Sequence, residues 1–112
     1  MKYNYEFSKG PFDILLISLP KEIALVGEFL RSDVHSKTWI EELDKVLNGE
    51  VSSLEFGGNS CDLEIGSDYT KITHRYVEDE ENTCEIETIE LKNLMLVWLA
   101  EYENYLQNRD SN

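Results

Sequence analysis

Alternating apolar and polar side chains predict β-strands in two parts of the chain. Residues 3–7 alternate aromatic with polar side chains and residues 12–18 form a more apolar run, so we expect two paired strands with a turn between them. Beyond residue 50, period-two patterns separated by turn residues predict a meander with strands at 51–56, 61–65 and 69–77, followed by a short strand at 84–87. One face of the meander should be buried and the other should meet water.

Apolar residues at helical spacing predict further elements. A long amphipathic helix is expected over 89–106, with Thr88 as its N-cap and an apolar stripe made of Leu91, Leu94, Met95, Trp98, Leu99, Tyr102, Tyr105 and Leu106. A shorter helix is expected over 36–47, with Ser36 as its N-cap and Asn48-Gly49 at its end.

The order of these elements predicts an α+β fold. We expect an antiparallel sheet of about five strands, one or two helices between the second and third strands, and a long C-terminal helix packed on one face. Residues 20–31 fit a short helix, although a strand stays open there because Gly27 disfavours a helix interior. Residues 1–107 are expected to form a single domain, and residues 108–112 a frayed polar tail.

Charge narrows the classes of function. Ten basic against 23 acidic residues give a net charge of −13, which disfavours binding to nucleic acid and to anionic membranes. Apolar residues make up 41% of the chain and aromatic residues 11%, which is enough to build a core. The apolar run at 14–19 is too short for a signal peptide. With Cys61 and Cys84 as the only cysteines, we expect a cytoplasmic protein with two reduced thiols.

Residue types suited to catalysis or metal binding do not form a recognisable motif. Residues 57–61 lie in an expected hairpin turn, where Gly58 and Asn59 suit a positive φ, and they form no nucleophile elbow. His35 and His74 have no ligand-type neighbour at the spacing of a zinc site. The sequence therefore predicts no metal, no cofactor and no enzyme activity. A small hydrolase that uses carboxylates is a third-ranked hypothesis.

Acidic residues concentrate between residues 50 and 90, where the only Lys or Arg residues are Lys71 and Arg75. The acidic residues fall on the polar face of the expected meander, on its loops and on the start of the last helix. One explanation is a solvated face that keeps the protein soluble, and the other is a docking surface for a basic protein. The second explanation gives a candidate partner-binding set: Asp62, Glu64, Asp68, Glu78, Asp79, Glu80 and Glu81.

Several stretches of the chain resemble small immunity proteins of bacterial polymorphic toxin systems, notably those of contact-dependent growth inhibition. These stretches are 21–30 with Asp33, 46–50, 58–65, and 86–91 leading into Trp98. The order of elements, with Tyr5-Glu6-Phe7 at its start, is also loosely similar to YacL-type small bacterial proteins. The glycines and apolar residues of these stretches are expected to specify the fold, with Trp98 in the core.

This resemblance implies a non-enzymatic cytoplasmic protein that binds and neutralises one cognate toxin domain, often a nuclease. Nucleases are basic because they bind phosphate, so an acidic inhibitor can imitate nucleic acid and cover the active site. The alternative is a non-enzymatic adaptor or a homodimeric interaction protein of the bacterial cytoplasm. A toxin domain encoded directly upstream would favour immunity, whereas a pull-down that recovers only the protein itself would favour the alternative.

Overall fold

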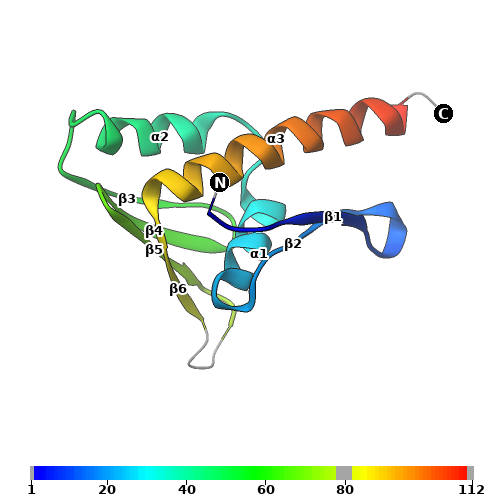
Figure 1. The fold of residues 1–112 in the computed structure, drawn as a ribbon, viewed down its shortest axis with the longest axis horizontal. Helices are drawn as coiled ribbons and strands as arrows, with labels where there is room; N and C mark the ends of the chain where they lie inside the picture. The colour runs from blue at the N-terminus through cyan, green and yellow to red at the C-terminus, as the bar shows by residue number, and fades with distance from the viewer. Residues whose placement is uncertain (1, 78–81, 111–112) are drawn as a thin grey trace.

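Two antiparallel sheets and three α-helices make up residues 2–77 and 82–110, which are the residues that the computed structural model describes (Figure 1). The smaller sheet is a hairpin of β1 (Glu6–Lys9) and β2 (Leu15–Ser18), with the 3₁₀ turn η1 (Pro11–Asp13) at its tip. The larger sheet is a meander of β3 (Ser53–Gly57), β4 (Cys61–Gly66), β5 (Tyr69–His74) and β6 (Thr83–Glu87). The helices are α1 (Ala24–Asp33), which follows the 3₁₀ turn η2 (Lys21–Ile23), then α2 (Thr38–Leu47) and α3 (Thr88–Asp110).

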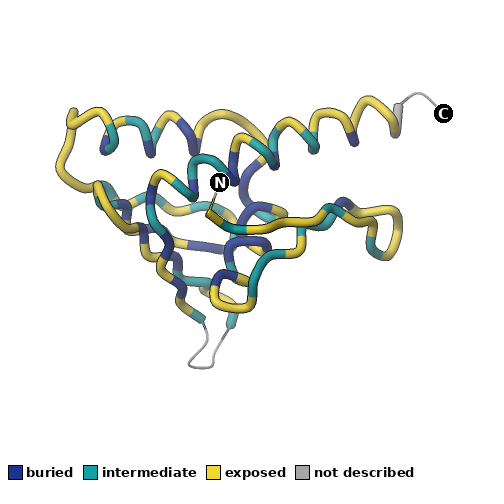
Figure 2. The backbone as a smooth tube through the Cα atoms, viewed as in Figure 1, coloured by how far each residue is buried: buried dark blue, intermediate teal, exposed yellow. Residues whose placement is uncertain are grey.

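Alternation along the meander gives the larger sheet an inner and an outer face. The register places Leu63 of β4 beside Phe56 of β3 and Ile72 of β5, and it places Ile72 beside Cys84 of β6. Apolar side chains therefore line up across all four strands on the inner face, and the residues between them are more exposed (Figure 2). The predicted two-faced meander is confirmed.

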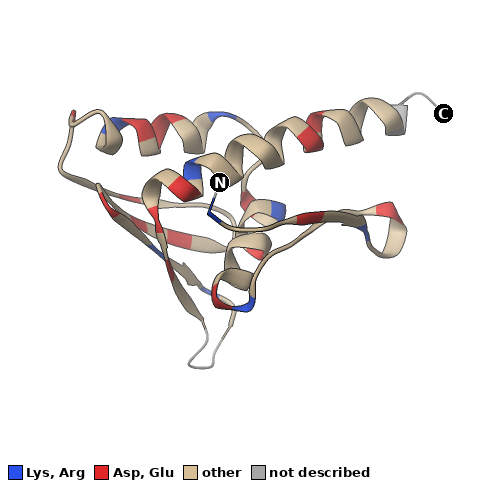
Figure 3. Cartoon of the chain, viewed as in Figure 1, with Lys and Arg blue, Asp and Glu red and all other residues tan. Residues whose placement is uncertain are grey.

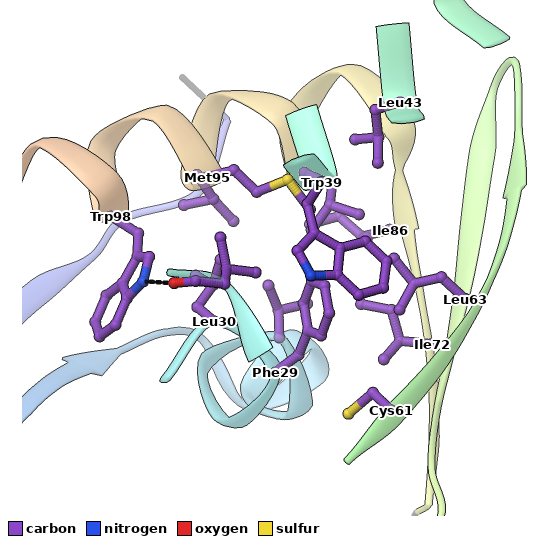
Figure 4. Packing of buried hydrophobic residues seen from close by; sticks show 14 of the residues in the cluster. Phe29, Leu30, Trp39, Leu43, Cys61, Leu63, Ile72, Ile86, Met95 and Trp98 are labelled. Carbon is purple, nitrogen blue, oxygen red and sulfur yellow. Dashed lines mark hydrogen bonds between the residues drawn. The ribbon is translucent and has the colours of Figure 1, made fainter. Parts of the chain in front are cut away.

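The helices cover the inner face and meet at the end of α1. α1 and α3 contact β5 and β6, while α2 contacts β3 and β4. The indole of Trp39 in α2 donates a hydrogen bond to the carbonyl oxygen of Asp33 at 3.1 Å, and that of Trp98 in α3 donates to Val34 at 2.7 Å (Figure 4). The last carbonyls of a helix lack partners within the helix, so these indoles both fill the core and satisfy the end of α1. Trp98 is 1% exposed, as predicted for a core residue.

The α+β class is confirmed, and the strands divide between two sheets. β1 begins later than expected because the first residues are drawn toward β6 and α3. The Tyr3 hydroxyl donates to Glu87 Oε1 at 2.6 Å, and the Lys2 backbone amide donates to Glu90 Oε2 at 3.1 Å. The turn η1 removes Phe12 from the expected second strand. The resulting hairpin packs through β2 against α1 and α3.

The open question at residues 20–31 resolves as helix, formed by η2 and α1. Gly27 faces β2, where an added Cβ would lie 3.2 Å from the carbonyl oxygen of Ile17. The close approach of strand and helix therefore explains a glycine in the helix interior despite its low helix propensity. At the other end of the chain, α3 continues to Asp110, beyond the expected end at Leu106.

The two expected N-caps are wrong. α2 begins at Thr38, so its N-cap position is Lys37 rather than Ser36, and Ser36 Oγ accepts the Thr38 amide at 3.4 Å from one residue further ahead. Thr88 is fully buried, and its hydroxyl donates to the carbonyl oxygen of Gly66 at 2.6 Å. That hydroxyl therefore joins the end of β4 to the start of α3 instead of satisfying the helix.

The expected positive φ at Gly58 and Asn59 is also wrong. Among the described residues, the glycine with a positive φ is Gly49, at 78°, directly after the end of α2. A Cβ at Gly58 would lie 2.6 Å from Asp33 Oδ2 and 2.8 Å from Trp39 Cζ2. Glycine is therefore required at position 58 for space rather than for backbone conformation.

Candidate partner-binding surface

Charged residues form a row across all four strands of the larger sheet (Figure 3), and the alternation of buried and exposed residues places this row on the outer face. In register, Glu55 of β3 lies beside Glu64 of β4, Glu64 lies beside Lys71 of β5, and Lys71 lies beside Glu85 of β6. Asp62 lies on the same side of β4, and all five side chains are exposed. These five residues are called the acidic outer face below.

Basic residues neutralise only part of this charge. Arg75 Nη1 lies 2.6 Å from Asp62 Oδ1, and Lys71 Nζ lies 3.9 Å from Glu64 Oε2. Both pairs are partly or largely exposed, and such pairs are screened by water and salt. Within the described residues, the other two glutamates of the row have no ion pair. The acidic outer face therefore presents a net negative charge to an approaching molecule.

Two shallow depressions lie over the acidic outer face. The first, of about 310 Å³, extends across the four strands, and its charged and aromatic lining residues are Glu55, Glu64, Tyr69, Lys71 and Glu85. The second, of about 420 Å³, has a lining that includes Glu55, Gly57, Asp62, Glu64 and Thr73. Gly57 and Gly66 border these depressions and contribute no side chain. Small-molecule sites are usually deep enough to enclose most of the ligand. These depressions are open and lined by carboxylates, so they are better suited to contact basic side chains that protrude from a protein partner.

Glu87, a neighbouring carboxylate on β6, is already bonded to residues of the N-terminal segment. Glu87 accepts the Tyr3 hydroxyl and the ammonium of Lys2. The hydrogen bond from Lys2, and then that from Tyr3, lower the pKa of Glu87 to about 2. Glu87 therefore holds the N-terminal segment against β6, and it is excluded from the acidic outer face.

The residues chosen from the sequence are only partly brought together. Asp62 and Glu64 lie on the acidic outer face, whereas Asp68 lies exposed in the turn between β4 and β5, at the opposite end of β4 from Asp62. Residues 78–81, which include the expected contacts Glu78, Asp79, Glu80 and Glu81, lie outside the described residues. The sequence-based set omitted two acidic members of the charged row, Glu55 and Glu85. Their alternation with buried apolar neighbours indicated exposure, but their alignment with Glu64 depends on strand register.

Comparison with known proteins gives a full-length relative. The chain is 37% identical over 113 residues to a Bacillus cereus protein named "Immunity protein", and the alignment covers 98% of this chain and 97% of that protein. The chain belongs to this family of immunity proteins. No protein-family model matches the chain, and no solved structure matches it.

Two of the stretches that resemble immunity proteins meet around a buried carboxylate. Asp33, at the end of α1, is 8% exposed. Its Oδ1 accepts the Ser60 amide at 3.0 Å, and its Oδ2 accepts the Cys61 amide at 3.0 Å. Asp33 thus fixes the turn between β3 and β4, and Gly58 provides the space for it. Gly58 thus holds the fold, as expected for the glycines of these stretches, and the same structural role for Asp33 was not predicted.

The thiols belong to the core as well. Cys61 and Cys84 are buried and unbridged. Burial, with Asp33 close by, raises the pKa of Cys61 to about 12, so the thiol stays protonated and unreactive near neutral pH.

Among the described residues, no three His, Cys, Asp or Glu side chains are placed to bind one metal ion. No helix in the described part of the chain has the length and apolar character needed to span a bilayer.

Proposed function

We propose that this protein neutralises a toxin by binding a cognate toxin domain. The observation that carries the proposal is the similarity to the Bacillus cereus immunity protein along nearly the whole of both chains. In the finer form of the proposal, the toxin is a basic nuclease, and the acidic outer face, with Asp68 at its edge, covers the nuclease active site. The protein acts in the cytoplasm and needs neither catalysis nor a cofactor for this role.

The arrangement of the carboxylates supports a basic partner. Glu55 and Glu64 are direct cross-strand neighbours, and like charges in that position destabilise a sheet. A cation from a partner, placed across this pair, would relieve the repulsion. The net charge of −13 adds a long-range field of the same sign, which accelerates association with a basic protein. A face that served solubility alone would not require two glutamates side by side.

A rescue experiment tests the immunity function. A candidate toxin domain, sought in the reading frame directly upstream, is expressed with and without this protein, and growth and co-purification are measured. We expect growth arrest without the protein, growth with it, and recovery of a stable complex. Continued arrest in cells that accumulate the folded protein would contradict the immunity function. A pull-down that recovers only the protein itself would point instead to an adaptor or a homodimer.

A matched pair of charge variants tests the acidic outer face. The test variant carries Glu55→Gln, Glu64→Gln and Glu85→Gln. The control loses the same charge at exposed positions elsewhere, with Glu41→Gln, Glu50→Gln and Glu103→Gln. At low salt, the association rate with the toxin domain should fall about tenfold in the test variant and much less in the control, because steering depends on local charge. The difference should shrink at high salt. Equal rates in both variants would show that the toxin binds elsewhere.

A further inference from the structure

The tip of the β1–β2 hairpin exposes a large aromatic side chain. Phe12 is 97% exposed, more than any other large hydrophobic residue among those described. Ile14, two positions further on, is 39% exposed. The hairpin extends away from the larger sheet, so its tip lies at one end of the molecule (Figure 1). Because its ring is not buried, Phe12 adds no hydrophobic stabilisation to the isolated fold.

The backbone at the tip is also unfavourable for these residues. Phe12 has φ 59° and ψ 26°, and Asp13 has φ 63°. The left-handed region is tolerated by Gly, Asn and Asp, whereas an aromatic residue there is an outlier. Such outliers persist where the surrounding structure holds them, and they cluster at ligand clamps and binding loops.

The surrounding hydrogen bonds hold this conformation. The Gly10 amide donates to the carbonyl oxygen of Ile14 at 2.8 Å, and the Ile14 amide donates to that of Pro11 at 3.3 Å. Lys9 Nζ and Asp13 Oδ1 lie 3.5 Å apart across the turn. Below the tip, Leu15 is 5% exposed and belongs to the core. The hairpin therefore presents Phe12 from a base that is packed against the rest of the molecule.

We propose that Phe12 is an anchor that inserts into an apolar pocket on the toxin domain. This inference rests on the proposed immunity function, and it adds a contact that charge does not provide. A few buried aromatic side chains carry most of the free energy of a typical interface, whereas exposed charges at the rim mainly affect the association rate. The exposed ion pair of Lys9 and Asp13 provides the polar border of such an anchor. The net charge of −13 favours a protein pocket over an anionic membrane as the site that receives the ring.

The tip and the acidic outer face are separate surfaces. They lie toward opposite ends of the longest axis of the molecule, which measures 46 Å (Figure 1). An interface of ordinary size covers about 800 Å² of each partner, so contact at one of these surfaces does not imply contact at the other. Substitutions at the two surfaces should therefore change the binding free energy independently and additively.

Two substitutions at Phe12 separate binding from stability. Phe12→Ala removes the ring and keeps the Cβ, and Phe12→Gly also relieves the left-handed backbone. Leu96→Ala is the control, because Leu96 is an exposed apolar residue on α3, with 49% of its surface exposed. The melting temperature, the dissociation constant for the toxin domain identified by rescue, and the salt dependence of binding are measured for each variant.

Both Phe12 variants should weaken toxin binding at least about 30-fold, which corresponds to about 2 kcal/mol. The loss should lie in the dissociation rate and be equal at low and high salt. The melting temperature should stay unchanged for Phe12→Ala and should stay unchanged or rise for Phe12→Gly. Leu96→Ala should bind as the wild type does.

Three outcomes would overturn the anchor. If the wild type binds the toxin domain and Phe12→Ala binds equally well, the anchor is wrong and the immunity function stands. If the wild type does not bind or rescue, both proposals fail together. If the wild type sediments as a dimer without toxin and Phe12→Ala sediments as a monomer, the ring instead contacts a second copy of the chain.

Discussion

Replacing Asp33 by alanine should destabilise the fold more than any surface substitution. The Asp33 carboxylate accepts the amides of Ser60 and Cys61, and Asp33 itself is 8% exposed. Alanine leaves both amides without this acceptor, and the Cys61 amide lies where water does not easily reach it. The turn between β3 and β4 therefore loses the link that joins it to the end of α1.

The expected loss of stability in Asp33→Ala follows from these two hydrogen bonds. A hydrogen bond to a charged group contributes about 1.5–3 kcal/mol, and a buried donor left without a partner costs a similar amount. We therefore expect Asp33→Ala to lower the free energy of unfolding by about 3–5 kcal/mol. That loss is a large part of the total free energy of unfolding, which is about 5–15 kcal/mol for a typical domain. Asp33→Asn keeps one acceptor oxygen and a similar volume, so its loss should be about half as large.

Urea denaturation followed by the fluorescence of Trp39 and Trp98 measures this loss, since both indoles are buried. Asp44→Ala is the matched control. Asp44 Oδ1 lies 2.7 Å from Lys92 Nζ in a partly exposed pair, which should contribute at most about 1 kcal/mol. If Asp33→Ala and Asp44→Ala shift the free energy of unfolding by the same small amount, the structural role of Asp33 is refuted. A loss in Asp33→Ala that is absent from Asp33→Asn would indicate a cavity rather than lost hydrogen bonds.

Three further predictions follow from single contacts. Gly58→Ala should lower the free energy of unfolding by about 1–3 kcal/mol in the same assay, because the new Cβ would lie 2.6 Å from a buried carboxylate oxygen. Glu87, held by Lys2 and Tyr3, has a pKa lowered from 4.5 to about 2, so its stabilising contribution is complete above about pH 4.5 and is lost as the pH falls toward 2. Glu87→Gln should reduce the fall of the urea midpoint over that interval. Cys61, whose pKa is raised to about 12, should resist a thiol reagent at pH 8 in the folded protein and react after denaturation.

The elements were predictable wherever one segment carries its own pattern. The apolar spacing of Leu91, Leu94 and Trp98 defines the buried stripe of α3, and alternation around Leu63 defines β4. The division into two sheets was not predictable in this way, because it depends on contacts between distant residues. The hydrogen bond from Tyr3 to Glu87, for example, joins the start of the chain to β6.

The same distinction between local pattern and tertiary structure applies to the candidate surfaces. The exposure of Asp62 and Glu64 follows from alternation within β4, and the structure confirms that exposure. The row that Glu64 shares with Glu55 and Glu85 requires the register of four strands, which no local pattern contains. Phe12 was expected within a strand, and its exposure arises from a left-handed turn that aromatic residues rarely adopt.

The residues that hold the fold are separate from the exposed residues proposed to contact a toxin, and this separation has a consequence for specificity. Asp33 is buried and bonds to the turn between β3 and β4, and it leaves no space for a side chain at Gly58, so a change at either residue disturbs that turn. Glu55, Glu85 and Phe12 point into solvent, so their replacement leaves the core contacts in place. If the toxin binds at the acidic outer face and at the hairpin tip, as proposed, substitutions there should change specificity for one toxin over another without loss of the fold. Under the proposed function, we therefore expect immunity proteins that share this fold but neutralise different toxins to differ mainly at exposed positions such as these.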